Sequence, residues 1–249
     1  MTVRASNSAS SRSPFDTHDV VNQAPPLTGY DVFGSDTALV DALERNGAAW
    51  AGDELRALGT RAGSFDAQEL GRRANENPPL LVTHDRYGNR VDRVRYHPAY
   101  HELMKVAVGH GLHAAPWADE RDGAHVARAA KIIVWYQVDG GHICPISMTY
   151  SVVPALRHAP ALAAAWEPRL TSRTYDPANR PVEEKAGATC GMAMTEKQGG
   201  SDVRANTTTA RPTGDDDGYL LTGHKWFCSA PMSDAFLMLA QAPLSLIHI

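Results

Sequence analysis

The chain has 249 residues, of which 43% are hydrophobic and 21% are charged. This is enough material for one large domain, or two small ones, with a buried core. The 24 basic and 28 acidic residues give a net charge of −4, which offers no electrostatic support for binding to nucleic acid or to an anionic membrane by this part of the protein. No stretch reads as a transmembrane helix or as the apolar core of a signal peptide, so no membrane partner is expected.

The cysteines and histidines do not form a metal-binding pattern. Cys144, Cys190 and Cys228 are far apart, and no pair of them has metal-ligand spacing. The histidine pairs 97/101 and 110/113 have helical spacing, but no carboxylate or cysteine completes a ligand set. We therefore expect no metal site, three free thiols, and a reduced, cytoplasmic protein.

The first part of the chain, after a short lead, has the pattern of a helical domain. Residues 1–20 are expected to be a disordered lead, because residues 5–13 (ASNSASSRS) are small and polar. Residues 21–187 are assigned to an N-terminal helical domain, in which apolar residues recur at helical spacing and proline or glycine marks the ends of segments.

Three signals place helix ends in this domain. Asp66 and Glu69 resemble the two members of a capping box. Pro98 suits the first position of a helix, because its missing N–H would be unpaired there in any case. Pro154 is expected to kink or break the segment that begins near Pro145.

From residue 188 onward the pattern changes to short strands separated by turns. Strand-like runs occur at 206–211, 219–222 and 234–241, with a turn at 214–218. Helices followed by strands indicate an α+β protein with two domains. Residues 188–241 are too few for a complete middle β-domain, and residues 242–249 are interpreted as a non-native tail.

Residues 191–202 (GMAMTEKQGGSD) contain the first segment with recognisable chemistry. A short apolar strand leads into a polar loop, in which Gly199 and Gly200 allow the main chain to approach a ligand closely. Thr195 and Ser201 place hydroxyl groups on either side. Such a loop suits a planar heterocycle with several acceptor atoms, or a pyrophosphate. An ordinary Gly-Gly turn between strands is an equally good interpretation of this pattern alone.

Residues 223–229 (GHKWFCS) form the second segment. They follow the expected hairpin, so the sheet could place them beside the first loop. Trp226 and Phe227 could then lie against a flat cofactor ring. Taken by itself, this segment is more typical of a half-buried strand with aromatic side chains.

Together the two segments resemble the flavin-binding signature of the acyl-CoA dehydrogenase family. Their spelling, MTEKQGGSD at 194–202 and HKWF at 224–227, is similar to the AidB-type (adaptive-response) branch, as are the stretches at 69–79, 95–99 and 144–149. The resemblance covers residues 20–241. It implies an N-terminal helical domain, a middle β-barrel or sandwich domain, and a C-terminal helical bundle that is absent from these residues.

The resemblance also implies a cofactor, flavin adenine dinucleotide (FAD), held between the β-domain and the C-terminal bundle. Thr195 would serve the pyrimidine edge and N5 of the flavin, Trp226 would pack on the isoalloxazine face, and Ser201 would reach the pyrophosphate or the acyl-CoA side. The full set of expected FAD contacts is Met192, Ala193, Met194, Thr195, Gly200, Ser201, Trp226, Phe227, Cys228 and Ser229.

The implied reaction is α,β-dehydrogenation of an acyl-CoA thioester, in which a carboxylate removes the α-proton and the flavin accepts the hydride. The resemblance places that base in the C-terminal domain, so no catalytic residue is assigned here, and these residues alone are expected to be inactive. Two alternatives stay open: a DNA-associated protective protein of the alkylation stress response, with DNA bound through the C-terminal part, and a flavin oxidase of the same fold. The family also implies a homo-oligomer, namely a tetramer.

Overall fold

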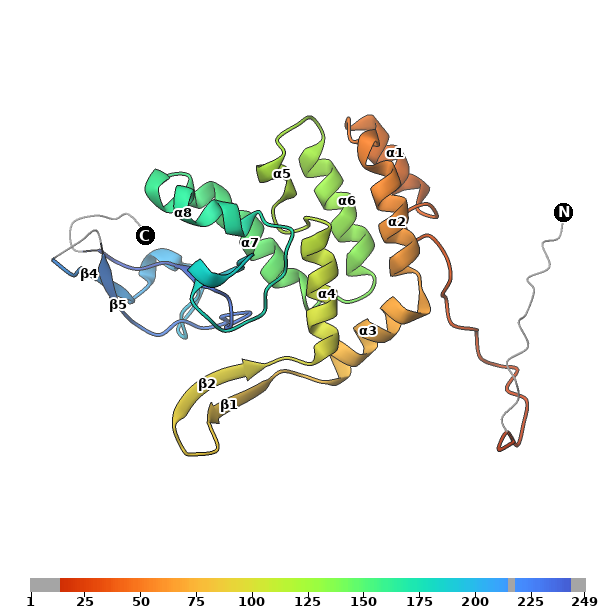
Figure 1. Ribbon diagram of the computed structural model, residues 1–249, viewed down its shortest axis with the longest axis horizontal. Helices are drawn as coiled ribbons and strands as arrows, with labels where there is room; N and C mark the ends of the chain where they lie inside the picture. The colour runs from red at the N-terminus through yellow and green to blue at the C-terminus, as the bar shows by residue number, and fades with distance from the viewer. Residues whose placement is uncertain (1–13, 215–217, 243–249) are drawn as a thin grey trace.

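The computed structural model describes residues 14–214 and 218–242 of the chain. Most of the lead expected at residues 1–20, the middle of the 214–218 turn and nearly all of the tail at 242–249 lie outside these residues. Helices occupy one part of the molecule and short strands another (Figure 1). This arrangement confirms the α+β class.

The helical part is organised around a buried apolar core. Leu55 of α2, Leu103 of α4 and Trp135 of α6 are almost completely shielded from solvent and belong to one hydrophobic cluster. The helices are α1 (Thr37–Arg45), α2 (Gly52–Ala62), α3 (Phe65–Glu76), α4 (Pro98–Gly109), α5 (Ala115–Ala118), α6 (Ala124–Tyr136), α7 (Ile143–Leu156) and α8 (Pro160–Leu170), with 3₁₀ turns at Ala49–Ala51, Val182–Glu184 and Val203–Ala205.

Two of the expected helix starts can be compared with the structure. Pro98 is the first residue of α4, as predicted, and the ring nitrogen Nδ1 of His97 accepts a hydrogen bond from the Ala99 N–H at 3.1 Å. The capping residue of α3 is Ser64, whose Oγ accepts from the Ala67 N–H at 3.2 Å. The prediction of Asp66 as the cap was therefore wrong by two residues, since the hydroxyl of Ser64 already serves the free N–H groups of the first turn.

Pro154 does not break α7, which continues to Leu156. A proline has no N–H, so the carbonyl four residues earlier, that of Tyr150, loses its helical donor. The indole N–H of Trp117 donates to this carbonyl instead, with an N···O distance of 2.8 Å. The replacement bond explains why the helix tolerates a proline in its last turn.

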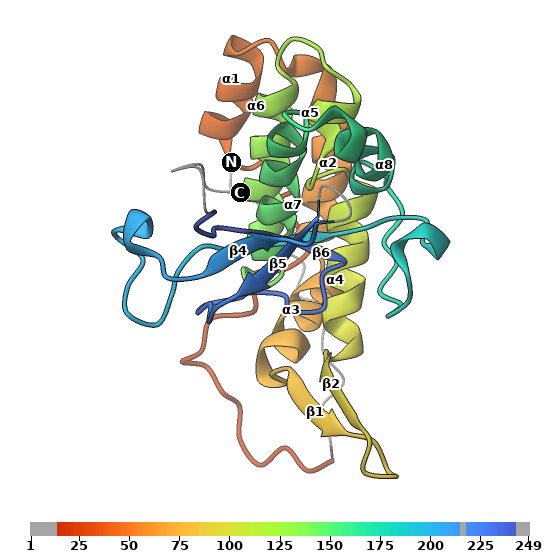
Figure 2. The same ribbon diagram turned by 90° about the vertical axis from the view of Figure 1, so that its left-hand side faces the viewer.

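A β-hairpin interrupts the helical part and was not expected from the sequence. Strands β1 (Leu80–His84) and β2 (Arg90–Arg95) pair antiparallel and project from the body of the molecule between α3 and α4 (Figures 1 and 2). The Asp85 carboxylate accepts from the backbone N–H groups of Tyr87 and Asn89 and so fixes the turn.

The strand part consists of β3 (Cys190–Ala193), β4 (Thr209–Pro212), β5 (Tyr219–Thr222) and β6 (Ala235–Met238). β3 runs parallel to β6, and β4 runs antiparallel to β5. The strand expected at 219–222 is confirmed, and those expected at 206–211 and 234–241 differ from β4 and β6 in their bounds. A bridge between Thr209 and Gln241 connects the two pairs.

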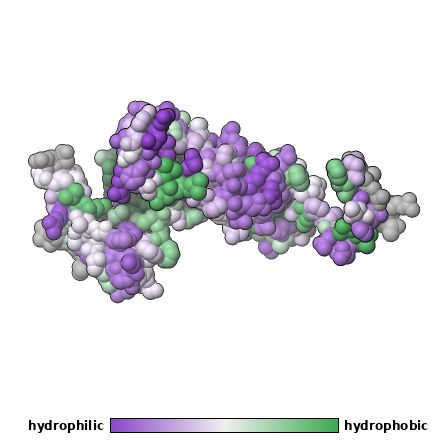
Figure 3. Space-filling model, turned by 90° about the horizontal axis from the view of Figure 1, so that it is seen from below, coloured by the Kyte–Doolittle hydropathy of each residue, from purple (hydrophilic) through white to green (hydrophobic). Residues whose placement is uncertain are grey.

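The strand part is anchored on the helical part through α7. The Cys190 N–H donates to the buried hydroxyl of Thr149 at 3.1 Å, and a second apolar cluster includes Val152, Leu170 and Cys190. On the molecular surface, hydrophobic residues gather between hydrophilic lobes on the side away from the N-terminal segment (Figure 3). Among the helices described, none is long and apolar enough to cross a membrane.

Candidate functional site

The two signature segments lie side by side. The Trp226 N–H donates to the Thr195 carbonyl with an N···O distance of 2.9 Å, and an antiparallel bridge joins Glu196 to Lys225. The expectation that the sheet would bring the second segment beside the first is confirmed. The two segments therefore form one continuous surface.

The centre of this arrangement is Glu196, a residue that the sequence analysis did not select. Its residue surface is 2% exposed. Its carboxylate accepts hydrogen bonds from the backbone N–H groups of Thr207 and Thr208 at 2.8 and 2.9 Å, and from their hydroxyls at 2.9 and 2.6 Å. Gln198 donates a further bond at 2.6 Å. The Lys225 ammonium completes the set, with Nζ 3.1 Å from Oε1.

These bonds keep Glu196 ionised. Burial by itself would raise the pKa of its carboxyl, but the hydrogen bonds from Thr207, Thr208 and Gln198 outweigh burial and hold the pKa well below its ordinary value. A carboxylate with all its lone pairs engaged cannot readily remove a proton from a substrate. Glu196 is thus a structural anchor for the loop and not a candidate proton acceptor.

The anchor also fixes the main chain that carries the signature. The Met194 carbonyl accepts from Lys225 Nζ at 3.2 Å and from the Asn206 side-chain amide at 3.0 Å. Met194 and Thr195 directly precede Glu196, so the position of their backbone is set by buried polar contacts. Such contacts hold this loop in one conformation.

Gly200 lies close to the Thr195 side chain within the loop. A Cβ atom on Gly200 would lie 2.8 Å from the Thr195 Oγ1 atom, so a side chain at this position would collide with Thr195. The hydroxyls of Thr195 and Ser201 make no hydrogen bond to another residue in the described ranges. They are available to a ligand.

The second segment presents aromatic surface to solvent. Trp226 is 43% exposed and Phe227 79% exposed, and their rings meet edge to face with centroids 6.0 Å apart. Phe227 has a backbone φ of +58°, an unusual value for a residue with a side chain. Exposed aromatic faces of this kind can stack on a flat ring system.

The ten residues expected to contact FAD fall into two groups. Ala193 is buried and Met192 packs partly against the second apolar cluster, so Ala193 could reach a ligand only through its main chain. The other eight line the surface of the two segments with at least part of their side chain or main chain accessible; they are Met194, Thr195, Gly200, Ser201, Trp226, Phe227, Cys228 and Ser229.

Comparison with known families bears directly on this surface. A family model described as the adaptive response protein AidB N-terminal domain matches residues 22–177, more than half of the chain. A second, described as the acyl-CoA dehydrogenase middle domain, matches residues 191–246 and includes both signature segments. The chain belongs to the AidB-type branch of the acyl-CoA dehydrogenase family.

Two curated relatives are similar over most of the chain. "Putative acyl-CoA dehydrogenase AidB" of Escherichia coli (strain K12) is 47% identical over 227 residues, which are 90% of this chain and 42% of the relative. "Acyl-CoA dehydrogenase family member 11" of Caenorhabditis elegans is 32% identical over 76% of this chain and 30% of the relative. The chain therefore spans less than half the length of either relative.

Two solved structures share the fold. The apo form of Bd2924 superimposes with a TM-score of 0.78 at 30% sequence identity, covering 90% of this chain and 45% of that one. The crystal structure of Caenorhabditis elegans ACDH-11 in complex with C11-CoA gives a TM-score of 0.77 at 27% identity, covering all of this chain and 42% of that one.

Proposed function

We propose that this chain is the N-terminal and FAD-facing portion of an FAD-dependent oxidoreductase that dehydrogenates an acyl-CoA thioester at its α and β carbons. The observation that carries the proposal is the buried Glu196–Lys225 link. It holds the two signature segments together while the Thr195 hydroxyl and the Trp226 ring stay available to a ligand.

The residues present fit a flavin. The open hydroxyls of Thr195 and Ser201 and the main chain beside Gly200 provide polar contacts for heterocyclic acceptors. The exposed face of Trp226 provides a stacking surface. When bound, FAD would accept a hydride, and hydrogen-bond donors of the Thr195 loop would stabilise the negative charge that this places on the ring.

The substrate class and the assembly belong to the same proposal. The crystal structure of ACDH-11 with C11-CoA supports an acyl-CoA substrate for this branch. We extend the proposal to a homo-tetramer in the cytoplasm, by family resemblance. A DNA-associated protective role through the C-terminal part is the second candidate, and the net charge of −4 gives these 249 residues no attraction of their own to phosphates.

The test is flavin retention by a protein in which this chain is joined to the C-terminal region of the Escherichia coli relative. Thr195→Ala together with Trp226→Ala should lower the flavin absorbance that remains after desalting, because both a polar and a stacking contact are removed. Trp50→Ala is the matched control, since Trp50 is 41% exposed and lies in the helical part.

Equal flavin occupancy and redox potential in the double variant and the parent would contradict the assignment of these contacts. The 249 residues alone should bind flavin weakly and should not reduce it with acyl-CoA, because Trp226 and Phe227 face solvent. A yellow protein that acyl-CoA bleaches would show that these residues contain the catalytic base.

A further inference from the structure

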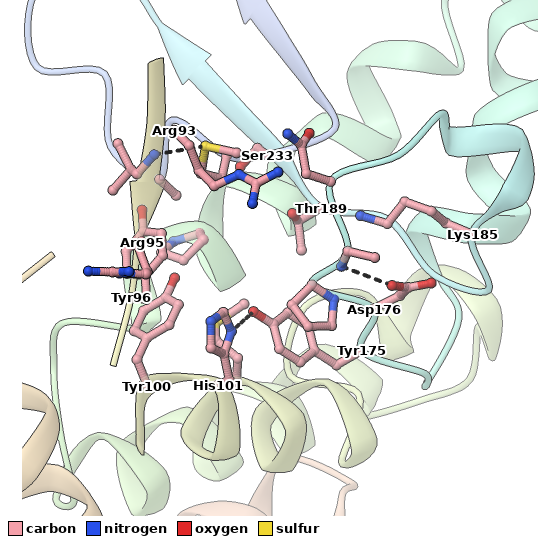
Figure 4. Close-up of a pocket in the computed structure, with 18 residues that line it drawn as sticks. Arg93, Arg95, Tyr96, Tyr100, His101, Tyr175, Asp176, Lys185, Thr189 and Ser233 are labelled. Atoms are coloured by element: carbon pink, nitrogen blue, oxygen red, sulfur yellow. Dashed lines mark hydrogen bonds between the residues drawn. The ribbon is translucent and has the colours of Figure 1, made fainter. Parts of the chain in front are cut away.

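A cavity of about 310 Å³ lies between the helical part and the strand part (Figure 4). The end of β2, one side of α4, the loop at residues 175–179 and the loop at residues 230–233 enclose it. This volume is at the lower end of the range of about 300–1,000 Å³ that is typical of small-molecule sites. None of the ten residues proposed to contact FAD lines it.

The charges around the cavity do not cancel. Arg93 and Arg95 of β2 both line it, and neither forms an ion pair within the part of the chain that the structure describes. The other charged lining groups are already paired. Lys185 Nζ lies 2.6 Å from Asp234 Oδ1, and Asp176 Oδ2 lies 2.7 Å from Arg180 Nη2. The lining therefore has an excess of two positive charges, which favours an anionic ligand.

Aromatic rings form one wall of the cavity. Tyr96 and Tyr100 stack with centroids 4.3 Å apart and an interplanar angle of 16°. Beside them, His101 Nδ1 and the Tyr175 hydroxyl are 2.9 Å apart and hydrogen-bonded, as Figure 4 shows. Burial raises the pKa of Tyr100 and of Tyr175 above the ordinary value and lowers the pKa of His101, so this wall carries no charge near neutral pH.

One polar group at the cavity has no partner. The Ser233 hydroxyl is shielded from solvent, and no described residue accepts or donates a hydrogen bond to it. An unpaired buried hydroxyl is unfavourable, so a ligand atom that bonded to it would recover free energy. Ser233 and Arg93 thus offer polar contacts to the same volume.

We propose that this cavity binds a small aromatic carboxylate. The guanidinium group of Arg93 points into the cavity and presents paired N–H donors, whose fork matches the two oxygens of a carboxylate, while Arg95 adds a second positive charge at the rim (Figure 4). The Tyr96–Tyr100 pair offers ring surface on which a flat aromatic body can pack. The assignment does not rest on the proposed dehydrogenase activity, because it uses a different set of side chains.

The test is isothermal titration of the 249-residue chain with indole-3-carboxylate, with indole-3-carboxamide as its neutral analogue and with octanoate as an aliphatic acid. The carboxylate should bind at one site per chain, and the carboxamide and octanoate should each bind about tenfold more weakly or less. Arg93→Gln combined with Arg95→Gln should weaken indole-3-carboxylate binding by about tenfold or more, as expected for lost charge-assisted hydrogen bonds.

Arg86→Gln is the matched control, because Arg86 belongs to the same hairpin but does not line the cavity. It should bind indole-3-carboxylate like the parent. Equal affinity for the carboxamide would overturn the role of the arginines, and tighter binding of octanoate would overturn the aromatic preference. Absence of binding by all three compounds to a chain that unfolds cooperatively would overturn the site itself.

Discussion

The Glu196 carboxylate and the Lys225 ammonium form an ion pair in which both side chains are almost fully buried, with 3.1 Å between Oε1 and Nζ. Each residue directly adjoins a proposed flavin contact, Thr195 in one segment and Trp226 in the other. The stability of the strand part and the geometry of the site therefore depend on the same pair of charges.

Glu196→Gln should lower the free energy of unfolding by about 3 kcal/mol, because breaking a buried pair leaves the Lys225 charge uncompensated. In addition, the NH₂ group of the glutamine side chain would replace one carboxylate oxygen. It would then face N–H and O–H donors of Thr207 or Thr208 that need an acceptor. Urea unfolding followed by circular dichroism would measure the change. Glu120→Gln, which removes an exposed partner of Arg157, should cost less than about 1 kcal/mol. Equal losses in the two variants would contradict the structural role of Glu196.

Stability should fall as the pH decreases from about 6.5 toward 4, with His113 as a main cause. Burial lowers the pKa of His113 to about 4, and its Nε2–H donates to the Ser172 carbonyl at 2.9 Å. In this window the unfolded chain binds a proton that the folded chain does not, so the unfolded state is favoured by up to about 3 kcal/mol at the acid end. Above pH 6.5 both states are neutral and the effect vanishes.

Urea unfolding at about pH 7 and about pH 5.5 would test this dependence, because the lowered pKa values of Glu54 and Glu196 act at lower pH. His113→Gln should reduce the difference between the two pH values. His158→Gln, at an exposed position, should leave the difference unchanged. A variant at His113 with the full pH dependence would assign the effect to other groups.

The three cysteines should separate into two reactivity classes. All three are free, as expected from their spacing; Cys144 and Cys228 are exposed and Cys190 is buried. Burial raises the pKa of Cys190 to about 11, which removes the reactive thiolate near neutral pH. Ellman's reagent should titrate two thiols rapidly in the native chain and all three in denaturant without reductant. Recovery of a single thiol in denaturant would indicate a disulfide.

Two helical glycines should respond in opposite directions to alanine. A Cβ at Gly71 of α3 would lie 2.1 Å from the Val138 carbonyl oxygen, whereas a Cβ at Gly52 of α2 would meet nothing within 4 Å. Gly71→Ala should therefore destabilise the fold by about 2 kcal/mol through overpacking. Gly52→Ala should stabilise it by up to about 1 kcal/mol, because alanine restricts the unfolded chain. Thermal unfolding would measure both, and a neutral Gly71→Ala would contradict the close helix contact.

The helical part was largely predictable because its signals are local. Pro98 marks a helix start through its own covalent structure, whereas the β1–β2 hairpin has little comparable signal. Its strands are exposed on most positions, so apolar and polar residues do not alternate between a buried and a solvent face. A strand without a buried face lacks the alternation of apolar and polar residues by which a sequence predicts a strand.

The candidate site was predictable only in part, for a related reason. The motifs located the two segments, and the structure brought them together. The motif letters gave no sign that Glu196 would be buried among threonine donors or that Lys225 would face it. Charged residues are mostly exposed, so only the long-range pairing of the segments reveals these two as buried.

The bond from the Trp117 indole to the Tyr150 carbonyl ties together two positions that are distant in sequence. A tryptophan at 117 is useful there because a proline at 154 leaves that carbonyl without a helical donor. If residue 154 were not proline, its backbone N–H could donate a hydrogen bond to the Tyr150 carbonyl. The Trp117 indole would then lose its acceptor. The two positions should consequently vary together among related sequences, so that family members lacking the proline are also free to replace the tryptophan.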